Sequence, residues 1–79
     1  MTRPHFLNGI QTVAETHLQF EGTLTEETSL AETLRLDSIR LLTLVAELEN
    51  HFEICLEDGD EHGLDTVGGL IDVLRLRSA

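Results

Sequence analysis

The sequence predicts an all-α fold, a small bundle of three main helices and one short helix with a long loop between the first two main helices. The chain has 79 residues, which suits one small domain spanning 1–79. Apolar residues make up 41% of it, yet there is no Trp or Tyr and only three Phe. The core must therefore consist mainly of leucine, isoleucine and valine. Leucine favours helix packing over a sheet, and three segments repeat apolar residues at helical spacing.

The first helix is expected at about residues 4–19. Pro4 suits the first turn of a helix, because its missing N–H group would have no partner there. Gly9 weakens the helix somewhat. The residues of the predicted apolar face recur three or four positions apart, as on an amphipathic helix: Phe6, Ile10, Val13, Ala14, His17 and Leu18.

The next stretch, "FEGTLTEETSLAETLRL", is interpreted as a loop of seventeen residues. Glycine, threonine and serine compete with helix formation here. The leucines Leu24, Leu30 and Leu34 would attach the loop to the core. A loop this long in a compact domain is often functional.

The clearest helix is predicted at about 38–52. Asp37 is a favoured N-cap residue directly before it. Its wide apolar stripe contains Ile39, Leu42, Val45 and Leu48, with Leu41, Leu44 and Phe52 beside them. Polar residues are expected to face outward: Arg40, Thr43, Glu47, Glu49 and Asn50.

The C-terminal third predicts a short helix at about 58–63, inside an acidic, turn-rich segment, and a last helix at about 66–76. Asp65 or Thr66 would cap the last helix. The pair Gly68-Gly69 in its first turns indicates either a close approach of another chain segment or a frayed start. The single Cys55 follows an apolar helix and is expected to be a buried thiol.

The charge restricts the classes of partner. Fifteen acidic residues against five arginines give a formal charge of −10. Such a chain lacks the clustered basic residues that bind nucleic acid or anionic membranes. The acidic surface suits basic protein partners or serves solubility alone. Without a signal-peptide pattern or a run long enough to span a membrane, we expect a cytoplasmic monomer.

The polar pair Asp37-Ser38 interrupts a leucine-rich run, "LRLDSIRLL". One interpretation is purely structural: Asp37 caps the helix and Ser38 occupies its first turn. The other is that Ser38 carries a phosphate-linked group, because free N–H groups at a helix N-terminus favour an attached anion. A serine hydrolase is disfavoured, since no glycine-framed nucleophile elbow surrounds Ser38. No histidine, cysteine or acidic spacing matches a metal site.

The segment "LDSIRLLTLVAELENHF" resembles the attachment helix of acyl carrier proteins and the related peptidyl and aminoacyl carriers. The shared pattern is Asp37-Ser38-Ile39, the apolar positions that follow, and Glu49-x-x-Phe52. "LDTVGGLIDVL" is similar to the last helix of the family. The resemblance covers residues 34 to 76.

This resemblance implies a stand-alone carrier rather than an enzyme. A phosphopantetheinyl transferase would attach 4′-phosphopantetheine from coenzyme A to Ser38, flanked by Asp37. A ligase would load the arm, and synthase or transferase enzymes would then use the thioester. The family's docking face implies roles for Ile39, Arg40, Thr43, Ala46 and Glu47. The implied acyl pocket is lined by Leu42, Val45, Leu48 and Ile71.

Two departures from the family pattern bear on the pathway. Many members have glycine where this chain has Arg35, and fatty-acid carriers usually have acidic residues where it has Arg40 and Thr43. These differences favour a dedicated biosynthetic pathway, of polyketide type or of peptidyl or aminoacyl type. A different class remains open: an unmodified acidic helical adaptor that binds a basic partner. The cargo and the docking enzymes are not specified by the sequence.

Overall fold

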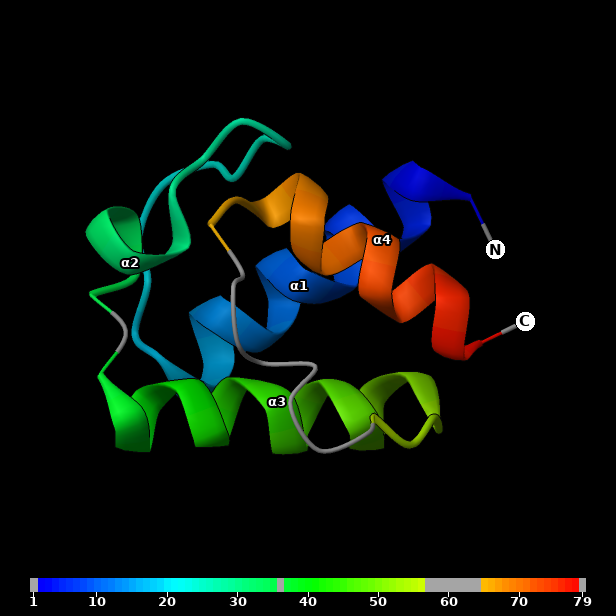
Figure 1. The fold of residues 1–79 in the computed structure, drawn as a ribbon. Helices are drawn as coiled ribbons and strands as arrows, with labels where there is room; N and C mark the ends of the chain where they lie inside the picture. The colour runs from blue at the N-terminus through cyan, green and yellow to red at the C-terminus, as the bar shows by residue number, and fades with distance from the viewer. Residues whose placement is uncertain (1, 36, 57–64, 79) are drawn as a thin grey trace.

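The computed structural model describes residues 2–35, 37–56 and 65–78. These residues form four helices and no strand: α1 (Arg3–His17), α2 (Leu30–Thr33), α3 (Ser38–Phe52) and α4 (Val67–Arg77). The all-α prediction is confirmed. In Figure 1, α3 runs along the bottom of the molecule, α1 and α4 lie above it, and α2 lies at the same end of the molecule as the start of α3. None of the described helices is long and apolar enough to cross a bilayer.

A short helix forms where none was predicted from the sequence. The predicted helix at 58–63 lies outside the described residues, whereas α2 forms within the segment that was interpreted as loop. Ser29 caps α2 by accepting a hydrogen bond from the N–H of Glu32 at 3.3 Å. Ser29 followed by Glu32 three positions later is the sequence pattern of a capping box. That signal was present in the sequence, and the loop interpretation of residues 30–33 is wrong.

α1 is the central helix, because it packs against both α3 and α4. It begins after the N-cap Thr2 and ends at His17, two residues before the predicted end. The leucines of the connecting segment complete the interior as the sequence suggested. The buried core consists of Phe6, Ile10, Val13, Ala14, Leu18, Leu24, Leu30, Leu34, Leu44, Leu48, Phe52, Val67, Leu70, Ile71 and Leu74.

The long connection between α1 and α3 is bonded to the start of α4. The Val67 N–H donates to the Thr28 carbonyl at 3.0 Å, and the Gly68 N–H donates to the Glu26 carbonyl at 2.8 Å. A Cβ at position 68 would lie 3.1 Å from that carbonyl oxygen. Gly68 therefore marks a close approach rather than a frayed start. Thr66, one of the two predicted caps, caps α4.

Gly9 is required by a second close approach. A Cβ at this position would lie 2.2 Å from Cζ of Phe52, which packs over α1. We expect Gly9→Ala to destabilise the fold by about 1–3 kcal/mol through overpacking, reduced by about 1 kcal/mol of gained helix propensity. Gly69→Ala is the matched control, because its Cβ would meet nothing closer than 3.8 Å. Thermal melting should show opposite shifts for the two variants; equal shifts would contradict the packing argument.

An ion-pair cluster joins α1, the connection and α4. Arg3 donates to Glu26 Oε1 at 2.6 Å and to Asp72 Oδ1 at 2.6 Å. The hydrogen bond from Arg3 lowers the pKa of Glu26 below its usual value of 4.5. A lowered folded-state pKa gives stability that is present above the unfolded-state value and lost as pH falls through the folded-state value.

The Arg3–Glu26 ion pair predicts part of the loss of folding stability at acidic pH. When the pH is lowered from about 5 to about 3, the melting temperature of Arg3→Gln should fall less than that of the wild type, because Glu26 in this variant no longer has a lowered pKa. Melting curves of the two proteins across this range test the prediction. Parallel pH profiles would show that the pair contributes nothing to stability.

The thiol of Cys55 is exposed. The expectation that it is buried is wrong, because α3 ends at Phe52 and the following Glu53 adopts a left-handed conformation (φ 55°) that turns the chain. The apolar neighbours of Cys55, Ile54 and Leu56, pack partly against the core instead.

Candidate functional site

Ser38 is the first residue of α3 and is exposed to solvent. The residue before it, Asp37, has an extended backbone and caps the helix. Its Oδ1 accepts the N–H of Arg40 at 2.8 Å, and its carbonyl accepts the N–H of Leu41 at 2.8 Å. The cap fixes where the helix begins and leaves the Ser38 hydroxyl at the open end of α3.

The start of α3 offers a favourable electrostatic environment for an anion. The first N–H groups of a helix have no intrahelical acceptor, and the helix dipole places partial positive charge at this end. A phosphate esterified to Ser38 would lie within this field. Since the hydroxyl is exposed, a modifying enzyme can reach it without disturbing the core. The residues present therefore fit a phosphate-linked group at this position.

The backbone just before the site is strained. Arg35 has φ of +51°, in the left-handed region where a side chain is disfavoured. We expect Arg35→Gly to raise stability by up to about 1 kcal/mol, the strain released less the entropy that glycine adds to the unfolded chain. Gln19, with φ of +56°, gives a matched variant away from the start of α3. Thermal melting checks both, and a loss of stability in Arg35→Gly alone would show that the arginine side chain contributes more than its backbone costs.

The outer face of α3 carries apolar side chains. Ile39 is 76% exposed and Leu42 is 61% exposed, and Ala46 is exposed nearby. The prediction that Leu42 faces the interior is wrong. Three-residue steps turn back by roughly 60° each on a helix of 3.6 residues per turn, so a stripe counted in threes drifts from one face to another. The buried face of α3 is formed by Leu44, Leu48 and Phe52, which all belong to the predicted apolar stripe.

The four residues expected to line an acyl pocket do not form one surface in this structure. Leu48 and Ile71 are fully buried members of the core. Val45 is half-buried, and Leu42 faces solvent. An acyl chain could reach Leu48 and Ile71 only if the packed helices moved apart.

The polar residues of the expected docking set form contacts within the chain. Arg40 donates to the backbone carbonyls of Leu18 at 2.8 Å and Leu34 at 3.3 Å, so its side chain folds inward rather than outward as expected. Glu47 lies 2.8 Å from the imidazole of His17. The Thr43 hydroxyl donates to the Ile39 carbonyl at 3.0 Å. Ile39 and Ala46 are the members of the set that are classed as exposed.

A groove of about 530 Å³ opens next to the start of α3. Sequence reasoning did not predict it, because the segments that form it meet only in the folded chain. The groove is lined by Leu18, Gln19, Phe20, Glu21, Thr33, Leu34, Arg35 and Arg40.

Comparison with known proteins decides the family. The family model described as a phosphopantetheine attachment site matches residues 8–74. The chain belongs to the acyl carrier protein family. It is 32% identical over 75 residues to an acyl carrier protein of Exiguobacterium sibiricum, covering 94% of this chain and 95% of the relative. An acyl carrier protein of another Exiguobacterium strain is 35% identical over 72 residues, which cover 90% of this chain and 91% of that relative.

A solved structure agrees with this assignment. A Mycobacterium tuberculosis protein described as an acyl carrier protein superposes with a TM-score of 0.80 at 25% identity, covering 90% of this chain and 96% of that one. The cofactor of this carrier is covalently attached 4′-phosphopantetheine. When attached, the cofactor supplies a thiol that holds an acyl group as a thioester.

Proposed function

We propose that Ser38 carries the 4′-phosphopantetheine arm and that the protein moves a thioester-bound acyl intermediate between the enzymes of a dedicated biosynthetic pathway, without catalysis of its own. The observation that supports this most strongly is the position of Ser38. It is an exposed hydroxyl at the capped start of α3, inside the segment that the family model covers. Tethering would raise the effective concentration of the intermediate at each enzyme that docks.

The enzymes of the pathway would approach along the outer face of α3. Because the arm starts at the N-terminus of this helix, an enzyme that receives the thiol end must contact the protein nearby. Ile39, Leu42 and Ala46 provide an exposed apolar strip there. The partners are a phosphopantetheinyl transferase, an acyl-loading ligase and a downstream synthase or transferase.

A polyketide or other secondary-metabolite pathway fits the α3 surface better than housekeeping fatty-acid synthesis. Arg40 and Thr43 stand where fatty-acid carriers usually have acidic residues, and Arg40 is held by two backbone carbonyls. An enzyme that recognises a row of carboxylates would find fewer of them here. An aminoacyl or peptidyl carrier is the alternative cargo class, and a cytoplasmic location fits both.

The decisive experiment is intact-mass measurement after incubation with coenzyme A and a broad-specificity phosphopantetheinyl transferase. The expected result is a mass gain equal to one phosphopantetheinyl group and one new reactive thiol in addition to that of Cys55. No gain in a folded sample would overturn the carrier assignment for Ser38 and leave the unmodified adaptor. If the mass gain is observed, loading assays with acyl and aminoacyl ligases separate the two cargo classes.

A further inference from the structure

The groove beside α3 combines two arginines in an otherwise acidic protein. Arg35 and Arg40 both line it, together with one acidic residue, Glu21. The whole chain has a formal charge of −10, so a site with an excess of positive charge is unusual on its surface. We refer to this site as the arginine groove.

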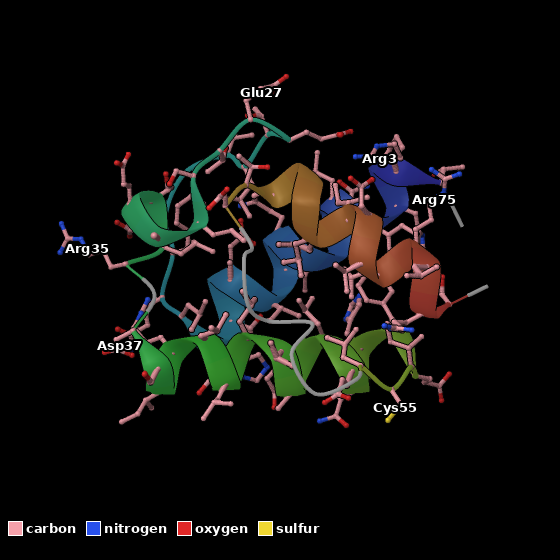
Figure 2. All side chains as sticks on the ribbon, viewed as in Figure 1. Arg3, Glu27, Arg35, Asp37, Cys55 and Arg75 are labelled. Carbon is pink, nitrogen blue, oxygen red and sulfur yellow. The ribbon has the colours of Figure 1, made fainter. Side chains whose placement is uncertain are left out.

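The charge of the arginine groove is available to a ligand. Arg40 uses N–H groups on Nε and one terminal nitrogen for the Leu34 and Leu18 carbonyls, and a guanidinium has five N–H groups. Among the described residues, Arg35 forms no hydrogen bond or ion pair. Arg3, in contrast, is paired with Glu26 and Asp72. Figure 2 places Arg3 and Arg75 at the opposite end of the molecule from Arg35 and Asp37.

The groove lies within reach of a group tethered to Ser38. Arg40 follows Ser38 by two residues in the first turn of α3, and Arg35 precedes it by three. A flexible arm attached at Ser38 can therefore fold back over the groove. The partly buried guanidinium of Arg40 would bind a carboxylate through charge-assisted hydrogen bonds, which are stronger than neutral ones.

The apolar interior and the arginine groove would accept different classes of acyl group. The interior around Leu48 and Ile71 is filled and apolar, so it could accept only a hydrocarbon chain, and only after the helices moved. The arginine groove is open and mainly polar, with positive charge at its edge. A short acyl group with a second carboxylate matches it in charge, and a groove of about 530 Å³ has room for such a group.

We propose that the arginine groove binds the free carboxylate of a short dicarboxylic acyl group that is carried as a thioester on Ser38. This inference rests on the proposed function, since it requires the arm at Ser38. It concerns noncovalent binding alone, and the thioester remains intact. Partial burial of Arg40 makes the attraction stronger than it would be at a fully exposed charge.

The test compares two four-carbon cargoes of similar size. Succinyl-coenzyme A and butyryl-coenzyme A are used with the transferase to load the protein, and intact mass verifies each product. We expect the succinyl form to melt about 4–8 °C above the butyryl form, with a shift of the Arg40 side-chain NMR signal in the succinyl form only. The difference should shrink at high salt, because screening weakens an ion pair.

Three variants separate the groove from general effects. Arg35→Gln and Arg40→Gln should reduce the difference between succinyl and butyryl forms, and Arg35→Gln does so without removing the bonds that Arg40 makes to the backbone. Arg75→Gln, at the other end of the molecule, should leave the difference unchanged. Equal melting of the two loaded forms would overturn the proposal, as would an Arg40 shift already present in the unloaded arm-bearing protein. Failure of loading would instead count against Ser38 as the attachment residue.

Discussion

Ser38→Ala is expected to abolish attachment of phosphopantetheine while leaving the fold intact. The hydroxyl oxygen of Ser38 is the proposed nucleophile: it loses its proton, bonds to the pantetheine-bearing phosphorus of coenzyme A and displaces adenosine 3′,5′-bisphosphate by breaking the pyrophosphate P–O bond. Alanine has no such atom. The side chain is exposed and lies outside the core, so the free energy of unfolding should change by no more than about 0.5 kcal/mol. Intact mass after incubation with the transferase, together with a melting curve, measures both effects.

Ser29→Ala is the matched control for this variant. Ser29 is also a serine at a helix N-terminus, but there its side chain caps α2 by accepting a bond from Glu32. Loss of that cap should cost about 1 kcal/mol, while attachment should proceed as in the wild type. The two serines thus give opposite outcomes. A full mass gain in Ser38→Ala would place the arm on another residue and refute the proposal.

The start of α3 could be predicted from sequence because its determinants are local. Asp37 caps the helix through bonds to residues three and four positions later, and the apolar run that follows has helical spacing. The position of Ser38 at the helix start follows from the same short stretch. The family resemblance rests on these residues too, so the family and its cofactor could be inferred before the structure was known.

Features that depend on contacts between distant segments could not be predicted. Gly9 and Gly68 have the same local signature, an unfavourable residue in a helix, and only the folded chain reveals that Phe52 and Glu26 approach them. The inward path of the Arg40 side chain depends on carbonyls at the ends of α1 and α2. The arginine groove exists because these same ends meet α3.

The rotation of α3 about its own axis was the main error in the predicted site. An apolar stripe wide enough to include Ile39 and Leu42 as well as Leu44 and Leu48 does not specify which part faces the core. Packing against α1 resolves this, because α1 buries Leu44 and Leu48 and leaves the other pair exposed. Exposure of Leu42 contradicts the interior position predicted for it, whereas Ile39 had been expected on the docking face.

Leu44→Ala is expected to destabilise the protein by about 2–5 kcal/mol, because it removes a fully buried side chain and leaves a cavity. A chain of 79 residues has a total stability of only about 4–12 kcal/mol, so the variant should lose a large fraction of it. Denaturant titration gives the free energy directly. The midpoint should fall while the slope with denaturant stays the same.

Leu42→Ala, two residues earlier on the same helix, should have the opposite profile. Its side chain is 61% exposed, so stability should change by no more than about 0.5 kcal/mol. If the outer face of α3 docks enzymes, the transferase or ligase should show a higher KM for this variant with kcat nearly unchanged, since the lost contact contributes to binding rather than to chemistry. A destabilisation equal to that of Leu44→Ala would show that α3 is rotated from the orientation described above. Unchanged KM values for every partner enzyme would move the docking surface away from this face.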